Sequence, residues 1–163
     1  MTISYRTIVS KDNEALSRII KDSLIEYNSA TAGTVFTDES TNHLSTTFQS
    51  ARSCYFVAIE NEKILGGAGI NVLPGAEENV CELQRMFLLP SARNKGIGKQ
   101  LMNLCLEFAK SNHYEWCYLE TFPALKEAIQ LYEKTGFKYI EHAMGSTGHF
   151  ACTTRMIYDL KEK

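Results

Sequence analysis

The chain has 163 residues, of which 44% are hydrophobic and 22% charged, and this size and mixture lead us to expect a single folded domain over residues 1–163. A net charge of −2 lacks the basic excess typical of nucleic-acid-binding proteins. No stretch approaches about 18 consecutive apolar residues and the N-terminus has no apolar signal segment, so we expect a cytoplasmic protein that does not bind a membrane.

The cysteines and histidines do not suggest a metal site or disulfides. The five cysteines are widely spaced, and no two of them form a C-x-x-C pair. Most lie within apolar runs, which favours reduced residues of the core over disulfide or zinc-bound residues. The four histidines lack the spacing of metal ligands. We therefore expect no bound metal.

The first half of the chain predicts a strand, two helices and a β-hairpin. Alternating β-branched residues indicate strands, whereas apolar residues three and four apart indicate helices. The expected elements are a strand over 3–9, a helix from Ser10 to about Asn28, a weaker helix from Asp38 through Phe48, and hairpin strands over 54–60 and 63–73.

The next predicted strand, residues 80–90, contains an irregularity. Residues 81–84 alternate between apolar and polar side chains, but Arg85 then falls where an apolar residue is due. A β-bulge at Arg85 would reconcile the two halves of the strand.

The second half of the chain predicts two helices and three strands. These are a helix that reaches about Ser111, a strand over 114–122, a helix over 124–135, and strands over 137–144 and 150–160. Gly136 lies where a left-handed residue would end the second helix. The complete order, β α α β β β α β α β β, indicates a layered protein of mixed α/β class.

The stretch ARNKGIGKQL, residues 92–101, joins a strand to a helix and is a candidate anion site. The first N–H groups of a helix have no partner within it and lie at the positive end of its dipole, so they stabilise an anion. Gly96 and Gly98 leave that backbone bare, and three cations between positions 93 and 99 add positive charge. The stretch predicts a site for a phosphate-bearing ligand, although an ordinary solvated turn could contain the same glycines.

Two well-known phosphate motifs are excluded by spacing. A P-loop ending at Lys99 would need glycine at position 93 and a hydroxyl residue at position 100, but the chain has Arg93 and Gln100 there. A dinucleotide fingerprint would need a third glycine at position 101, where Leu101 stands.

The segment ELQRMFLLPSARNKGIGKQLM resembles the central motif of the GNAT superfamily of acyl-CoA N-acyltransferases. The family's pyrophosphate loop has Gln or Arg, then x-x-G-x, then Gly or Ala, and is matched here by Arg93, Gly96 and Gly98. A second segment is similar to the family's signature A-x-x-L-Y-x-x-x-G-F, through Ala128, Leu131, Tyr132, Gly136 and Phe137. The predicted order of elements agrees with the family fold over nearly the whole chain.

The resemblance implies a fold and a co-substrate. The fold is α/β (α+β), with a mixed, mostly antiparallel twisted sheet of about seven strands and four helices, in which strands 4 and 5 splay apart. The co-substrate is acetyl-CoA, whose pantetheine would bind the main chain of Met86, Phe87 and Leu88. Its pyrophosphate would lie on the following loop and helix start, namely Arg93, Asn94, Lys95, Gly96, Ile97, Gly98 and Lys99.

The resemblance also implies a catalytic acid, Tyr132, and we expect a base in the fourth strand. The phenol of Tyr132 would protonate the leaving thiolate, since an ordinary phenol with a pKa of about 10 holds its proton at neutral pH. A tyrosine that only packs in the core is the alternative. Glu82 is the candidate base, because burial in a central strand can raise its pKa. Glu82 could instead hold the substrate's ammonium or pair with Arg85, with water accepting the proton.

Other positions suggest where the acceptor would bind. Gln84 and His149 are further candidate contacts to substrate. Many relatives have asparagine three residues before the alanine of the second motif, where this chain has Leu125. The resemblance places the acceptor site in residues 24–45 and 142–152. Candidate binders of a cationic acceptor there are Glu26, Tyr27, Asp38 and Glu39.

The implied reaction is transfer of an acetyl group from acetyl-CoA to a primary amine by direct attack in a ternary complex. The amine would belong to a small molecule, such as an amino acid or a polyamine. The alternatives are a protein lysine or N-terminal acetyltransferase, and a non-catalytic acyl-CoA-binding module. Paired subunits are common in the family, so a homodimer is a further expectation.

Overall fold

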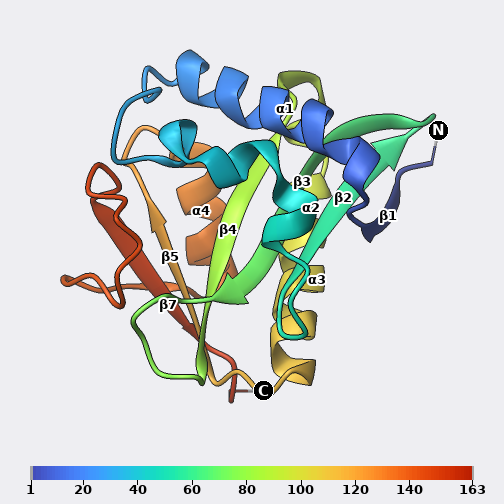
Figure 1. Ribbon diagram of the computed structural model, residues 1–163. Coiled ribbons are helices and arrows are strands. Elements are labelled where there is room, and N and C mark those ends of the chain that lie inside the picture. Colours follow the sequence, from blue (N-terminus) through green and yellow to red (C-terminus); the bar gives the residue numbers. More distant parts are fainter. Residues whose placement is uncertain (1, 163) are drawn as a thin grey trace.

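The computed structural model describes residues 2–162, which form one seven-stranded sheet with helices on both faces (Figure 1). The strands are β1 (Ser4–Thr7), β2 (Cys54–Glu60), β3 (Lys63–Val72), β4 (Val80–Leu88), β5 (Trp116–Thr121), β6 (Lys138–Tyr139) and β7 (Thr154–Asp159). The α-helices of these residues are α1 (Asn13–Glu26), α2 (Leu44–Thr47), α3 (Ile97–Ser111) and α4 (Lys126–Thr135). The strand order is β1-β2-β3-β4-β5-β7-β6, and all neighbours are antiparallel except β4 and β5. The predicted mixed sheet with four helices is therefore confirmed.

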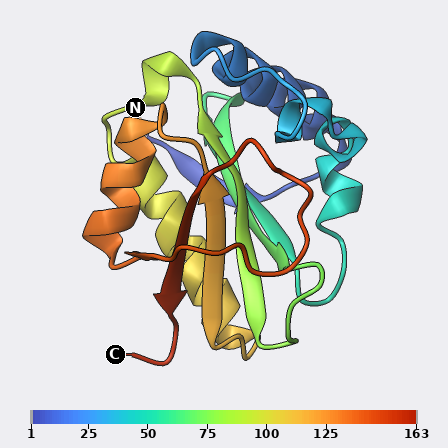
Figure 2. The ribbon, with the colours of Figure 1, turned by 90° about the vertical axis from the view of Figure 1, so that its left-hand side faces the viewer.

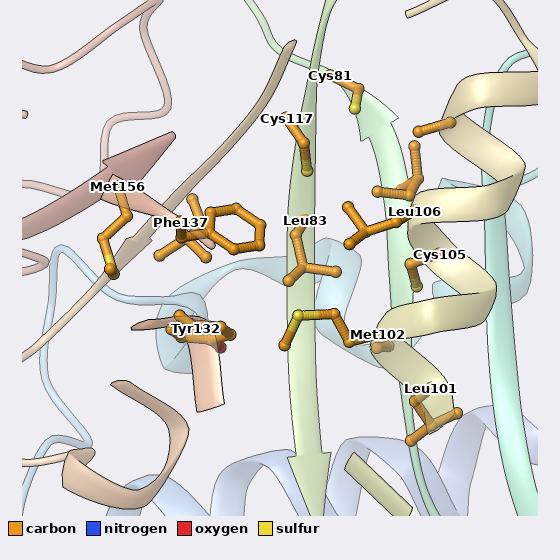
Figure 3. Close-up of a cluster of buried hydrophobic side chains, with 14 of the residues drawn as sticks. Cys81, Leu83, Leu101, Met102, Cys105, Leu106, Cys117, Tyr132, Phe137 and Met156 are labelled. Atoms are coloured by element: carbon orange, nitrogen blue, oxygen red, sulfur yellow. The ribbon is translucent and has the colours of Figure 1, made fainter. Parts of the chain in front are cut away.

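The sheet lies between two layers of helices. α1 and α2 cover one face, and α3 and α4 cover the other (Figure 1, Figure 2). On the α3 side, residues four apart along the helix, such as Leu101 and Cys105, pack into the larger core cluster (Figure 3). On the α1 side, Leu16, Ile20 and Leu24 belong to a second cluster. Each long helix thus buries the apolar stripe that its sequence predicts.

β4 and β5 diverge after a short stretch of pairing. Their register contains three pairs, the last of which joins Glu82 to Tyr118. β4 nevertheless continues to Leu88, and β5 continues to Thr121. The main chain of β4 beyond Glu82 therefore has no strand beside it on that edge, which confirms the predicted splay.

The predicted bulge at Arg85 is also confirmed. Arg85 has a φ of 52°, and the register with β3 shifts between Gly67 and Gly69. The bulge turns the Arg85 side chain inward, where it is 8% exposed. Its carbonyl oxygen accepts a hydrogen bond from the Tyr55 hydroxyl at 2.8 Å.

Gly67 in β3 allows the close approach of a neighbouring strand. A Cβ atom at this position would lie 2.3 Å from Cε1 of Tyr55 and 2.6 Å from the carbonyl oxygen of Phe56. We expect Gly67→Ala to lower the free energy of unfolding by about 1–3 kcal/mol, because a backbone atom cannot move aside cheaply. Urea denaturation of the variant and the wild type would measure the change, and an unaltered midpoint would contradict this account of β3.

The boundaries of the second predicted helix are wrong. The helix expected from Asp38 through Phe48 is replaced by one 3₁₀ turn, Glu39–Asn42, followed by the short α2. Hydroxyl groups compete for the backbone here, since Oγ1 of Thr41 donates to the carbonyl oxygen of Val35 at 2.7 Å.

The strands expected over 137–144 and 150–160 are shorter than predicted. β6 has two residues and β7 begins at Thr154, so residues 140–153 form an irregular loop. Gly145 and Gly148 both have positive φ, which a strand does not allow. The loop crosses the face of the sheet over the splayed strands (Figure 2). In the part of the chain that the structure describes, no helix is long and apolar enough to cross a bilayer.

Candidate active site

The start of α3 presents a row of unpaired backbone donors. Gly96 precedes the helix with a left-handed φ of 80°, and its carbonyl oxygen accepts from the Gln100 N–H at 3.1 Å. Among the described residues, the N–H groups from Asn94 to Lys99 have no hydrogen-bond acceptor. These amides lie at the positive end of a helix dipole, so they form a suitable binding surface for an anion.

A cavity of about 360 Å³ adjoins these amides and lies between the end of β4 and α4. Of the residues predicted to bind the cofactor, all but Lys95 and Ile97 line it. Ile97 is buried in the core, and the Lys95 side chain is exposed. On the α4 side the cavity is bounded by Leu125 and Leu131. The loop at the start of α3 and the second motif, which includes Leu131, thus line the same cavity.

Arg93 lines this cavity, but its guanidinium is bound to α1. Its Nη1 and Nη2 donate to the carboxylate of Glu26 at 2.7 and 3.1 Å, and its Nε donates to the Leu88 carbonyl oxygen at 3.3 Å. The hydrogen bond raises the pKa of Arg93 and lowers the pKa of Glu26. Glu26, expected as a candidate binder of a cationic acceptor, therefore connects α1 to the end of β4.

A second, smaller cavity of about 60 Å³ lies where β4 and β5 diverge. Its polar lining comes from β4, β5, α4 and the loop 140–153, through Glu82, Gln84, Arg85, Glu120, Thr121, Tyr132, His149 and Cys152. Met86, Phe87 and Leu125 line both cavities, so the two spaces meet at these side chains. The fold thereby brings Glu82 and Tyr132 to one space next to the end of the larger cavity.

Tyr132 is 6% exposed and packs against Phe137 with ring centroids 5.7 Å apart. Figure 3 shows both rings facing Leu83 of β4. Within residues 2–162 the Tyr132 hydroxyl has no hydrogen-bond partner. Burial raises the pKa of this phenol above its ordinary value, so it keeps its proton throughout the neutral range.

Glu82 is 5% exposed, and its Oε1 accepts a hydrogen bond from Nε2 of Gln84 at 2.5 Å. Burial raises the pKa of Glu82 to about 7, with the Gln84 hydrogen bond opposing and the charge of Glu120 adding to the rise. A carboxylic acid with this pKa can accept and release protons at neutral pH.

Gln84 lies between two charged side chains. Its Oε1 accepts from Nη1 of Arg85 at 3.2 Å, while its Nε2 donates to Glu82. Arg85 itself forms its ion pair with Asp38 at 3.3 Å, and not with Glu82. The pairing of Glu82 with Arg85, left open by the sequence, is therefore not what the structure contains. Gln84 instead orients the Glu82 carboxylate.

Asp38 joins the first half of the chain to the loop 140–153. Its Oδ2 lies 2.7 Å from Nε2 of His149 and 3.3 Å from Nη2 of Arg85. The main chains of the same two segments are joined by a hydrogen bond from the Ala151 N–H to the Gly33 carbonyl oxygen at 3.1 Å. These contacts hold the loop 140–153, which contributes His149 and Cys152 to the lining of the smaller cavity, against the first half of the chain.

Glu120 and Cys152 complete the polar lining of the smaller cavity. Burial raises the pKa of Cys152 to about 12, and the charges of Glu120, Glu82 and Asp38 add to the rise. The thiol is therefore a poor nucleophile at neutral pH. Sequence reasoning missed Glu120, although an acidic residue in the apolar run WCYLETF was a visible signal. Among the described residues no group of His, Cys, Asp and Glu could hold a metal ion.

Comparisons with known proteins agree with this geometry. The model of the acetyltransferase (GNAT) family matches residues 18–137. The uncharacterized N-acetyltransferase YjgM of Escherichia coli K12 is 38% identical over 156 residues, which cover 95% of this chain and 93% of that protein. A GNAT-family acetyltransferase of Staphylococcus aureus Mu50 has a TM-score of 0.86 at 22% identity, covering 98% of this chain and 100% of that one.

A further structure is similar in fold and contains a cofactor. The PaiA N-acetyltransferase of Thermoplasma acidophilum, solved in complex with coenzyme A, has a TM-score of 0.77 at 19% identity and covers 98% of this chain and 99% of that one. The splayed sheet and its adjoining cavities thus define an acyl-CoA-dependent transferase fold. The chain belongs to the GNAT family of acetyltransferases and is an acyltransferase.

Proposed function

We propose that the protein transfers the acetyl group of acetyl-CoA to a primary amine of a small molecule, by direct attack in a ternary complex. One observation supports this proposal above the others. The unpaired amides from Asn94 to Lys99 border a cavity that meets a second cavity containing Glu82 and Tyr132. A diphosphate on those amides would direct the rest of the cofactor toward these two side chains.

The cofactor would extend from α3 along β4. Its pyrophosphate would bind the amides from Asn94 to Lys99, and its pantetheine would bind the main chain of Met86, Phe87 and Leu88 at the unpaired edge of β4. Both sets of groups belong to the main chain, so they bind the cofactor largely independently of side-chain identity. The thioester would then lie where the two cavities meet.

The reaction requires one proton to leave the amine before attack. Glu82 accepts this proton from the acceptor ammonium, directly or through water, and leaves a neutral amine. The nitrogen lone pair attacks the thioester carbonyl carbon, and the C–N bond forms as the C–S bond breaks. Tyr132 donates its proton to the leaving sulfur and regains a proton from the nitrogen. The products are the N-acetylated amine, free CoA and one proton passed to solvent from Glu82.

The size of the smaller cavity favours a small acceptor over a protein. Its volume is about 60 Å³, and the loop that carries His149 is tied to the first half of the chain by the contact of His149 with Asp38 and by the pairing of Ala151 with Gly33. A polypeptide substrate would need an open groove along the splayed strands. Protein lysines and N-termini therefore remain the second choice.

The test is acetyl transfer measured as thiol release from acetyl-CoA across a panel of alkylamines, amino acids, polyamines and lysine peptides. We expect turnover with small amines and little turnover with peptides. Faster transfer to peptides would favour the second choice. CoA binding by calorimetry without turnover on any acceptor would indicate a binding module. Absence of both would contradict the proposal.

Gly98→Ala tests the match of this loop to the family's motif. A Cβ atom at position 98 would meet only Cδ2 of Leu131 at 3.4 Å and Cδ1 of Leu88 at 3.8 Å, and both residues line the larger cavity. We expect stability within about 0.5 kcal/mol of wild type, or higher, because alanine favours a helix. The family's loop accepts Gly or Ala at this position, so the Kd for CoA should rise by no more than about threefold. Calorimetric titration measures this, and a Kd about tenfold or more above that of wild type would contradict the match.

Three expectations from the sequence stay predictions. They are the single domain over residues 1–163, the cytoplasmic location and the homodimer. Light scattering on the purified protein at several concentrations would check the last of these.

A further inference from the structure

Glu120 is a carboxylate that the reaction described above does not use. It lies on β5, two residues beyond the last position that pairs with β4, and it lines the smaller cavity together with Glu82 and Tyr132. It accepts a hydrogen bond from the hydroxyl of Tyr118, so both side chains are on the same face of β5. Glu120 is therefore placed where an acceptor amine must enter.

The partners of Glu120 hold it without neutralising it. The hydroxyl groups of Tyr118 and Thr147 donate to its two oxygens at 2.6 and 2.5 Å. In the described part of the chain Glu120 has no ion pair within 4 Å. Arg155 faces it in the β5–β7 register, but Nη1 of Arg155 donates to the carbonyl oxygen of Glu141 at 3.2 Å. The Nε of Arg155 is buried and has no hydrogen-bond partner among the described residues. Glu120 is thus fixed in position but forms no ion pair with the two nearby cations, Arg155 across the strand pair and Arg85 in the cavity lining.

The other two carboxylates near the cavity differ from Glu120. Asp38 is compensated by Arg85 and has His149 within 2.7 Å. Glu82 is almost fully buried and has one hydrogen-bond donor, Gln84, among the described residues. Burial leaves Glu82 able to take up a proton near neutral pH. The Tyr132 hydroxyl, on a side chain that is 6% exposed, reaches this space without a hydrogen-bond partner among the described residues and is free to bond to a polar ligand group.

We propose that Glu120 binds the ammonium group of the acceptor and positions its nitrogen between Glu82 and the thioester. This inference rests on the proposed function and specifies its substrate class, which is alkylamines that are cationic at neutral pH. The ammonium is the missing partner charge of Glu120. It gives one proton to Glu82, and the nitrogen lone pair then attacks the carbonyl carbon. Amines that are neutral in solution, such as arylamines, gain nothing from Glu120.

The kinetic test compares Glu120→Gln with wild type at saturating acetyl-CoA, using the best alkylamine of the panel. Glutamine keeps the shape but removes the charge; its oxygen can accept one of the two hydroxyl hydrogen bonds, and its NH₂ group can donate to the other hydroxyl oxygen. We expect KM for the amine to rise at least tenfold, with kcat within threefold and KM for acetyl-CoA unchanged. Glu77→Gln, on an exposed loop, is the matched control and should leave all three unchanged. An unchanged KM for the amine would overturn the inference.

A binding measurement keeps this inference separable from the proposed function. The ¹⁵N-labelled, CoA-saturated protein is titrated with ethylammonium chloride and, as an ionic control, with sodium propionate. Wild type should show saturable shifts at Glu120 and Thr147 with ethylammonium alone, and Glu120→Gln should lose them. Such shifts without turnover would support the inference while contradicting the proposed function. Equal shifts in both proteins, or none in wild type, would overturn it.

A second variant covers failure of Glu120→Gln to fold. Glu120→Asp keeps the charge and withdraws the carboxylate from the cavity by one methylene group. We expect its KM for the alkylamine to rise severalfold, and a KM within twofold of wild type would overturn the inference.

Discussion

Replacing Tyr132 by phenylalanine is expected to lower kcat by about 10²-fold or more while leaving KM for acetyl-CoA unchanged. The phenol lines the smaller cavity and is protonated at neutral pH, so it has a proton to give to the leaving sulfur. The ring itself would stay in place, since it packs against Phe137 without help from the hydroxyl. Steady-state thiol release at saturating amine measures the loss.

Stability and a second tyrosine provide the controls for this experiment. Because the Tyr132 hydroxyl has no partner among the described residues, Tyr132→Phe should unfold at the same urea concentration as wild type or a higher one. Tyr158→Phe is the matched variant, because Tyr158 packs on the other side of Phe137 at 5.2 Å and does not line the smaller cavity. It should keep full activity. A kcat for Tyr132→Phe within threefold of wild type would leave Tyr132 as a core residue only.

The second large effect is the pH dependence that Glu82 gives to the reaction. A base must be ionised to act, and burial raises the pKa of Glu82 to about 7. Wild-type kcat/KM should therefore rise with pH and level off above about pH 8. At pH 5 only about 1% of Glu82 is ionised, which lowers the rate about 10²-fold.

Glu82→Gln should lose this pH dependence. Its kcat/KM should lie about 10²-fold below wild type at pH 8, and the two should converge near pH 5 because wild-type Glu82 is then protonated. Glu77→Gln should retain the wild-type profile. An unchanged pH profile in Glu82→Gln would show that another group accepts the proton.

The same pKa shift makes a prediction about stability. The ordinary pKa of 4.5 is raised to about 7 in the folded protein, so between these pH values the folded state holds a proton that the unfolded state has lost. The free energy of unfolding therefore falls as pH rises through this range, by about 3 kcal/mol in total. Glu82→Gln, which cannot ionise, should be more stable than wild type by about this amount at pH 8.5 and by less than about 1 kcal/mol at pH 5. Urea denaturation at both pH values measures the difference.

Local signals predicted most of the fold because they depend on neighbours along the chain. Apolar residues three and four apart defined α1 and α3. Arg85 falls where an apolar residue of the strand is due, and this indicated a bulge that the structure contains. The same approach failed for residues 35–48 and 140–153. There hydroxyl side chains and positive-φ glycines leave the backbone without a periodic pattern, so tertiary contacts decide its path.

The stretch proposed to bind phosphate could be inferred from the sequence for a related reason. Its donors are main-chain groups at the start of a helix, and Gly96 and Gly98 mark that start in the sequence itself. Side-chain partners were harder to assign. Arg93 is drawn to Glu26, 67 residues away, and Gln84 lies between Arg85 and Glu82. Such pairings depend on which surfaces the packed helices bring together.

The sequence by itself therefore determined the order of elements, the candidate anion site and the two motifs of the acyltransferase family. The signal for each element or motif lies within one or two adjacent elements, so neighbours along the chain are enough to reveal it. Only the tertiary structure decided what surrounds the reacting groups. It placed Asp38 against His149, 111 residues apart, and left Glu120 in the cavity with two hydroxyl partners and, among the described residues, no ion pair. The physical reason is that the pKa of a carboxylate and its pairing depend on burial and nearby charge, which arise from contacts between distant segments.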